Sequence, residues 1–104
     1  DGYARASTGA DVLVRGRRVP VVGVISMDAC TVDLTDVPEA GLDDEVVLLG
    51  VQDGDAIPVL ELAQRRTTIP WEVLTGMARR LTRVYDAAAG PLGVRTLAGE
   101  TLVR

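Results

Sequence analysis

The hydrophobic positions near the N-terminus predict a β-hairpin. Residues 11–15 form a short run rich in β-branched side chains, and Gly16 follows where a tight turn favours a residue without a Cβ atom. A second such run covers residues 19–25, so the two runs are expected to pair around residues 15–17. Pro20 has no backbone N–H and is therefore expected at a strand start or on an unpaired edge.

Two further strands are predicted before the middle of the chain. Cys30, Val32 and Leu34 alternate with polar residues, which is typical of a half-buried strand with one solvated face. This alternation favours an inert, buried thiol at Cys30. A loop over residues 36–44 separates this strand from an apolar run at residues 45–50, which predicts the next strand.

Helical spacing replaces the strand pattern in the following segment. Apolar residues between positions 57 and 63 fit one face of a helix. Residues 68–70 are expected to cap a second helix, which runs from Trp71 to about Leu81 with its apolar residues at helical spacing. At the start of this helix Trp71 is expected as a core anchor whose indole N–H is paired.

The order of these elements predicts a mainly β fold. Four or five short strands followed by two short helices favour a small closed barrel or a Greek-key-like sheet, in which closure removes exposed edges. Residues 83–85 are expected to form a closing strand, and the Ala- and Gly-rich tail at residues 87–93 is expected to fray. We therefore predict one β-rich domain over residues 1–104, poorly defined after about residue 86.

The amino-acid composition excludes several kinds of catalysis by this chain alone. The sequence contains no His and no Lys, and Cys30 is its single cysteine. Without His there is no imidazole base at neutral pH and no His-activated Ser or Cys nucleophile. Without Lys no Schiff base can form with a carbonyl group, and one Cys without His cannot build the usual zinc site. No catalytic residue and no metal site are therefore expected.

Charge and hydropathy indicate a soluble protein of the cytoplasm. The 11 basic and 15 acidic residues leave a net charge of −4, which argues against nucleic acid or an anionic membrane as a partner. A single cysteine excludes an internal disulfide, and neither a membrane-spanning apolar run nor a signal peptide is present. Because the chain starts at Asp1 and not at Met, we expect its start to be a cut in a longer polypeptide.

Two features of the sequence are candidates for ligand binding. The segment Ser26-Met27-Asp28 interrupts a β-branched pattern. It is either a bulge in which Met27 fills core space, or a loop whose backbone N–H groups hold a carboxylate or phosphate. The second feature is an N-terminal basic cluster, which is either a solvated hairpin face or a contact for an anion: Arg5, Arg15, Arg17 and Arg18.

Several short motifs occur in a fixed order along the chain. They are DGYAR at 1–5, VPVVG at 19–23, SMD at 26–28, GLDDEV at 41–46 with LG at 49–50, TIPWEVL at 68–74 and RLTRVY at 80–85. Taken together, from residue 1 to about residue 85, they closely resemble the C-terminal domain of alanine racemase. The number and order of the motifs make the resemblance specific.

The resemblance implies an enzyme of which this chain is only one part. Members of the family are homodimers that interconvert L- and D-alanine for the bacterial cell wall, and their N-terminal barrel holds pyridoxal phosphate as a Schiff base with lysine. The C-terminal domain of one subunit closes the active site on the barrel of the other and contributes a tyrosine as second acid/base. That tyrosine precedes the segment matching Asp1. The isolated chain is therefore expected to be inactive and to bind no cofactor.

The resemblance also implies roles for residues of this chain. Met27 corresponds to the family methionine whose backbone N–H holds the substrate carboxylate. Asp28 and Ser26 match residues that order the loop around Met27. Arg5 and Ile69 match residues that line the entrance corridor for substrate. Trp71 replaces a tyrosine that contacts the cofactor phosphate. Val24 occupies a position often held by arginine.

Two alternatives to an alanine racemase domain stay open. A racemase for serine or for several amino acids has the same architecture, and a standalone β-barrel interaction module would lack the catalytic half altogether. The racemase hypothesis predicts a lysine-bearing barrel and a tyrosine upstream of Asp1, whereas the module hypothesis predicts a natural start close to Asp1.

Overall fold

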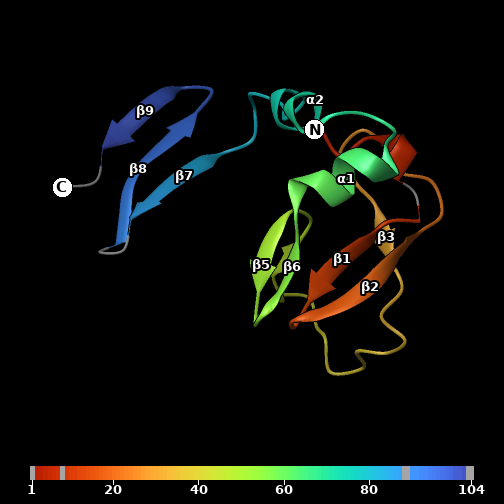
Figure 1. Cartoon of the computed structure of the whole chain (residues 1–104). Helices are drawn as coiled ribbons and strands as arrows, with labels where there is room; N and C mark the ends of the chain where they lie inside the picture. Colours follow the sequence, from red (N-terminus) through yellow and green to blue (C-terminus); the bar gives the residue numbers. More distant parts are fainter. Residues whose placement is uncertain (1, 8, 88–89, 103–104) are drawn as a thin grey trace.

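The computed structural model describes residues 2–7, 9–87 and 90–102. Asp1 of the first motif and positions 88 and 89 of the predicted fraying tail lie outside the described residues. Figure 1 shows two parts, which we call the body (residues 2–81) and the C-terminal sheet (residues 83–102). A single segment of chain joins them, and the molecule is elongated, with extents of 42 × 32 × 22 Å.

The predicted N-terminal hairpin is confirmed. Strands β1 (Asp11–Val14) and β2 (Arg17–Val22) pair antiparallel. Arg15 and Gly16 between them both have positive φ angles, of 52° and 73°, as in the two-residue turn whose twist matches that of the flanking strands. A Cβ atom on Gly16 would lie 2.7 Å from the Cβ atom of Asp53, so the turn needs a glycine at this position.

A curled four-stranded sheet forms the centre of the body. Its strand order is β3-β2-β1-β4, where β3 is Thr31–Val32 and β4 is Val46–Val47. The mainly β class with two short helices is therefore confirmed. In the described part of the chain β3 and β4 remain the two edges of the sheet, so it forms a half barrel and does not close.

Pro20 lies inside β2 and not at a strand start, and on the side of β3 it lies beyond the last paired residues, as the alternative of an unpaired position predicted. Its carbonyl accepts a hydrogen bond of 3.0 Å from the Asp33 N–H, one residue beyond the end of β3. The nitrogen of a strand residue faces the same side as its carbonyl. The missing N–H therefore falls where the regular pairing with β3 has already ended, and the sheet loses little by it.

Two short strands precede the helices. β5 (Gly50–Gln52) and β6 (Asp55–Ile57) form a two-stranded sheet, so the single strand expected at residues 45–50 is divided between β4 and β5. Ile57 ends β6 opposite Gly50, and α1 (Val59–Arg65) begins only after Pro58. The expectation that helical structure starts at residue 57 is therefore wrong by two positions.

The second helix is shorter than predicted. α2 covers Pro70–Thr75 and ends at Gly76, whereas the apolar spacing continues to Leu81. Glycine is a poor helix former, and the residues beyond Gly76 continue in turns, with the Met77 N–H donating to the Leu74 carbonyl at 3.4 Å. No helix of the described residues is long and apolar enough to cross a membrane.

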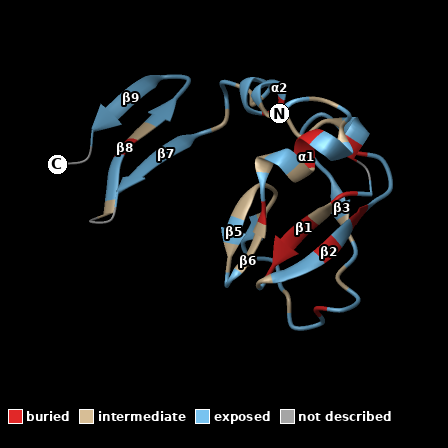
Figure 2. Cartoon of the chain, viewed as in Figure 1, coloured by how far each residue is buried: buried red, intermediate tan, exposed pale blue. Residues whose placement is uncertain are grey.

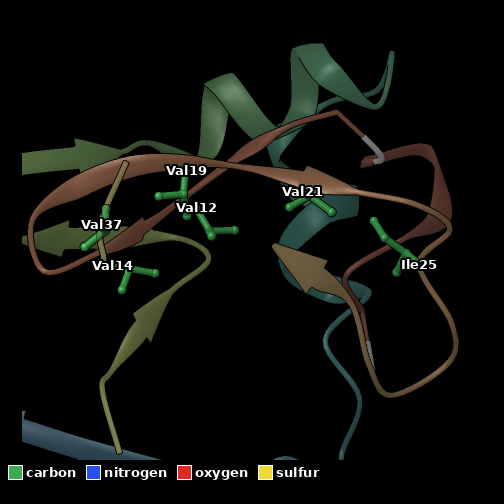
Figure 3. Close-up of a cluster of buried hydrophobic side chains, with 6 residues drawn as sticks. All are labelled: Val12, Val14, Val19, Val21, Ile25 and Val37. Atoms are coloured by element: carbon green, nitrogen blue, oxygen red, sulfur yellow. The ribbon is translucent and has the colours of Figure 1, made fainter. Parts of the chain in front are cut away.

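Most of the buried residues lie in the body (Figure 2). One cluster lies between the hairpin and the loops beside it, as Figure 3 shows: Val12, Val14, Val19, Val21, Ile25 and Val37. A second cluster joins the helices through Leu62, Ala63 and Val73. Tyr3 packs against both clusters, so the N-terminal segment fastens the helices to the half barrel.

The C-terminal sheet consists of three antiparallel strands: β7 (Arg83–Ala87), β8 (Gly90–Thr96) and β9 (Gly99–Leu102). The predicted strand at residues 83–85 is present, but its partner is β8 and not the sheet of the body. Fraying is not what the structure shows at residues 90–93, which belong to β8. Gly93 is the one buried residue among the described residues of these strands.

Candidate functional site

The loop that follows β2 carries the central residue of the predicted site. Ile25 is 3% exposed and anchors the loop in the core. Immediately after it, the backbone N–H and the hydroxyl of Ser26 both donate to the Ala29 carbonyl, at 2.9 and 3.0 Å, and close a turn. Met27 follows Ser26 in this turn, with 91% of its surface exposed. The interpretation of Met27 as a side chain that fills the core is therefore wrong.

Arg5 lies beside this loop. It begins a short 3-10 helix (Arg5–Ser7), and its Nε donates to the Ile25 carbonyl at 3.4 Å. Arg5, Ser26 and Met27 line one cavity of about 390 Å³. The structure thus brings together three of the six predicted site residues.

A second cavity, of about 570 Å³, also includes residues of this loop in its lining. Asp28 and Cys30 line it together with Met27 and with apolar side chains of the body, among them Leu48 and Leu62. Cys30 is exposed, so the expected buried thiol is wrong. The alternation around Cys30 does not form a full strand, because β3 contains only two residues.

Ile69 and Trp71 lie at the start of α2. Ile69 is the residue before the helix and is 53% exposed, and Trp71 is 74% exposed. Trp71 is therefore not the core anchor that the sequence predicted. Neither residue lines the two cavities beside the Met27 loop, so their assignment to the entrance corridor stays a prediction.

The arginines of the hairpin pair within the chain. Arg18 donates to both carboxylate oxygens of Glu61, at 2.7 and 2.8 Å, which ties β2 to α1. Arg15 donates to Asp44 at 2.9 Å. These hydrogen bonds lower the carboxyl pKa values of Glu61 and Asp44 below their ordinary range. Arg15 and Arg18 therefore belong to internal ion pairs and not to a contact for an external anion.

Tyr3 lines both cavities and has an unusual environment. Its hydroxyl group is buried and has no hydrogen-bond partner among the described residues. Burial raises the pKa of Tyr3 to about 12, because the phenolate would lose hydration. At neutral pH Tyr3 is therefore a neutral packing residue and not a base.

Sequence reasoning missed Arg66, which also lines the cavity that contains Met27. Arg66 follows the last residue of α1, where a basic side chain ordinarily complements the negative end of a helix. In the sequence, the two consecutive arginines Arg65 and Arg66 indicate only the end of a helix. The closeness of α1 to the N-terminal segment, which brings Arg66 to this cavity, is a tertiary feature.

Known proteins match most of this chain in sequence and in structure. A family model described as "Alanine racemase, C-terminal domain" matches residues 1–85. Alanine racemase from Thermodesulfovibrio yellowstonii is 50% identical over 86 residues, which cover 82% of this chain and 24% of that protein. The chain thus spans about a quarter of the length of this curated relative.

Solved structures agree with this match. The crystal structure of alanine racemase from Bacillus anthracis with bound L-Ala-P superposes with a TM-score of 0.88 at 33% identity, over 94% of this chain and 25% of that one. Alanine racemase from Bartonella henselae, with covalently bound pyridoxal phosphate, superposes with a TM-score of 0.62 at 32% identity, over 75% of this chain and 22% of that one.

Proposed function

Because this chain belongs to the alanine racemase C-terminal domain family, we propose that it is one domain of an enzyme that interconverts L- and D-alanine. The observation that carries the proposal is the family match over residues 1–85, together with 50% identity to a curated alanine racemase. The rest of the enzyme supplies the catalytic groups, and the isolated chain is inactive. We extend the proposal to a homodimer in the cytoplasm, in which this domain completes the active site of the partner subunit.

The residues of this chain do not fit a site that holds pyridoxal phosphate covalently. The cofactor is attached covalently in the Bartonella henselae enzyme, and a covalent link to a protein amine requires a lysine, which this sequence lacks. The proposal therefore assigns the cofactor to another part of the enzyme. At most, the exposed indole N–H of Trp71 offers a single donor to the cofactor phosphate.

We assign substrate binding to the backbone N–H of Met27. The hydrogen bonds between Ser26 and Ala29 fix the turn that presents Met27, and Arg5 holds the preceding Ile25 carbonyl. A backbone N–H fixed in this way is a suitable donor to a carboxylate, because its direction is set before the substrate arrives. Ser26 thus orders the loop. By the family resemblance we also assign Asp28 to ordering the loop, and Arg5, Ile69 and Trp71 to lining the approach to it.

Kinetics of two variants of the full-length protein test this assignment. Met27→Leu keeps the backbone donor, so kcat/KM for alanine should stay within about threefold of the wild type. Met27→Pro removes the donor and should lower kcat/KM by about tenfold or more, the value of a hydrogen bond to a charged group. Equal kinetics for the two variants, at equal unfolding midpoints, would contradict the role of the Met27 N–H.

Two further measurements test the wider proposal. The full-length protein should racemise alanine faster than serine, and preference for serine would assign it to another racemase class. The isolated 104-residue chain should show no absorbance band of the cofactor after incubation with pyridoxal phosphate and removal of the excess. A stable band on the purified chain would contradict the argument from the missing lysine.

A further inference from the structure

Arg66 is fixed at the edge of the cavity that contains Met27. Its backbone N–H donates to the Leu62 carbonyl at 3.1 Å and so completes the last turn of α1. The next residue, Thr67, has a positive φ angle of 56° and turns the chain away from the helix axis. The half-buried side chain of Arg66 then reaches the N-terminal segment, where Nη1 donates to the Gly2 carbonyl.

The guanidinium of Arg66 is only lightly bound in this position. Its hydrogen bond to the Gly2 carbonyl is long, at 3.4 Å, and no Asp or Glu of the described residues forms an ion pair with it. Arg15 and Arg18, in contrast, are paired with carboxylates. A guanidinium has five N–H donors, so Arg66 keeps most of its capacity for a ligand at the cavity.

The charge of the cavity lining favours an anionic group. Arg5 and Arg66 contribute two cations, whereas no Asp or Glu is found among the described residues that line this cavity. Met27 and Ser26 also line this cavity. An amino acid that enters this space is attracted by its carboxylate and repelled by its ammonium group, so the cavity orients it carboxylate first.

We propose that Arg66 binds the carboxylate of the amino-acid substrate in this cavity, beside Met27. This inference rests on the proposed racemase function and adds a substrate-binding residue to it. The planar guanidinium matches the two oxygens of a carboxylate and can hold both, which fixes orientation as well as position. Arg66 acts before the chemical step, so its removal weakens substrate binding and leaves the reaction rate of bound substrate unchanged.

Binding of acetate to the chain itself tests the inference without any enzymatic activity. We expect saturable changes in the NMR signals of the Arg66 Nε–H group and of the Met27 and Ser26 amides as sodium acetate is added. Arg66→Gln should abolish this saturation. Arg65→Gln is the matched control, because it removes the same charge one residue earlier, outside the cavity lining, and it should leave acetate binding intact.

Inorganic phosphate distinguishes a carboxylate site from a phosphate site, since guanidinium binds both anions. Acetate should saturate the signals at the same concentration as phosphate or a lower one. Saturation by phosphate at a concentration tenfold lower would assign the site to a phosphate group and overturn the proposal. The absence of any saturable change would overturn it as well.

Steady-state kinetics of the full-length enzyme give the second test. Arg66→Gln should raise KM for L-alanine about three- to tenfold at an unchanged kcat. Arg66→Lys keeps the charge but loses the planar guanidinium, so its KM should lie between those of the wild type and Arg66→Gln. Arg65→Gln should change neither constant. Unchanged KM in an active Arg66→Gln enzyme overturns the role of Arg66 and leaves the racemase function standing. If the wild type is inactive, the racemase function fails, and acetate binding alone decides on Arg66.

Discussion

The body and the C-terminal sheet are both built from short antiparallel strands, but they differ in what the strands bury. In the body, β1 presents three consecutive residues with at most 2% exposure, and two clusters of apolar side chains lie beneath the strands and helices. In the C-terminal sheet, Leu97 and Leu102 are 73% and 77% exposed. Pairing of strands therefore accounts for the shape of both regions, whereas burial stabilises only the body.

The comparisons with relatives differ in how much of the C-terminal sheet they include. The family model ends at residue 85, inside β7, so β8 and β9 lie beyond it. The Bacillus anthracis structure covers 94% of the chain, whereas the Bartonella henselae structure covers 75%. The candidate site lies wholly in the body. Matched substitutions in the body and in the C-terminal sheet can show whether the two regions unfold independently.

The largest expected difference concerns leucine side chains of equal size. Leu13 in β1 is 0% exposed, so Leu13→Ala should lower the free energy of unfolding by about 2–5 kcal/mol. Leu102→Ala in β9 should change it by about 0.5 kcal/mol or less, because the side chain is already in solvent. Urea unfolding followed by circular dichroism measures both. Equal losses would show that the C-terminal sheet belongs to the same cooperative unit as the body.

The next prediction compares two glycines in hairpin turns. Gly16 and Gly99 both have positive φ angles, of 73° and 126°. Gly16→Ala meets the Cβ atom of Asp53 at 2.7 Å as well as backbone strain, so it should cost about 2–4 kcal/mol. Nothing lies within 4 Å of a Cβ atom on Gly99, and the strain of Gly99→Ala should remain local to its turn.

Hydrogen exchange separates these two effects. Gly16→Ala should accelerate exchange of the buried β1 amides, whereas Gly99→Ala should accelerate exchange in β8 and β9 only. If Gly99→Ala also lowers the unfolding midpoint of the body, the two regions are coupled more strongly than their burial indicates.

The sequence predicted the parts of the fold that depend on local pattern. The hairpin around Gly16 follows from two β-branched runs and a turn that needs positive φ, and both are visible in the sequence. Helix ends were less accurate: apolar spacing extended the second helix to Leu81, but Gly76 ends it. Pattern also failed for Cys30, because two residues of β3 are too few for alternation to determine burial.

The candidate site was predictable only where a motif carried it. Ser26 and Met27 were singled out by the interrupted β-branched pattern and Arg5 by the basic cluster, but their roles came from the resemblance; the structure brings the three to one cavity. Arg66 was not identified, because the contact that places it there joins residues 64 positions apart. A long-range contact of a single arginine leaves no periodicity in the sequence.

Ion pairs give a smaller contrast between the two regions. Glu61 accepts two short hydrogen bonds from Arg18. In the C-terminal sheet, Nε of Arg95 lies 3.5 Å from Oε1 of Glu100, and both side chains are more exposed. Glu61→Gln should cost about 1 kcal/mol or less at pH 7, since the side chain is 38% exposed, and Glu100→Gln should have no measurable effect.

The effect of Glu61→Gln should also depend on pH. Because the pKa of Glu61 is lowered in the folded chain, its contribution is present above the ordinary glutamate value of about 4.3. It is lost as the pH falls through the folded pKa. The difference in stability between wild type and variant should therefore be smaller at pH 3 than at pH 7. A constant difference at both values would assign the loss to packing.

The smallest expected effect concerns the two tyrosines, one in each region. The buried hydroxyl of Tyr3 has no partner among the described residues, so Tyr3→Phe should be neutral or stabilise the chain by up to about 1 kcal/mol. Tyr85→Phe, at a side chain that is 46% exposed, is the control and should be neutral. A loss of more than about 1 kcal/mol for Tyr3→Phe would show that the hydroxyl is hydrogen-bonded.

The stabilities of wild type and of Tyr3→Phe should differ in their dependence on alkaline pH. The pKa of Tyr3 is raised to about 12, so the folded chain holds this proton more tightly than the unfolded chain does. The resulting stabilisation is complete below the ordinary tyrosine value of about 10 and is lost as the pH rises through 12. Wild type should therefore lose stability between pH 10 and pH 12 more steeply than Tyr3→Phe. Since Tyr3 packs against both core clusters, its ionisation should weaken the packing of both clusters together.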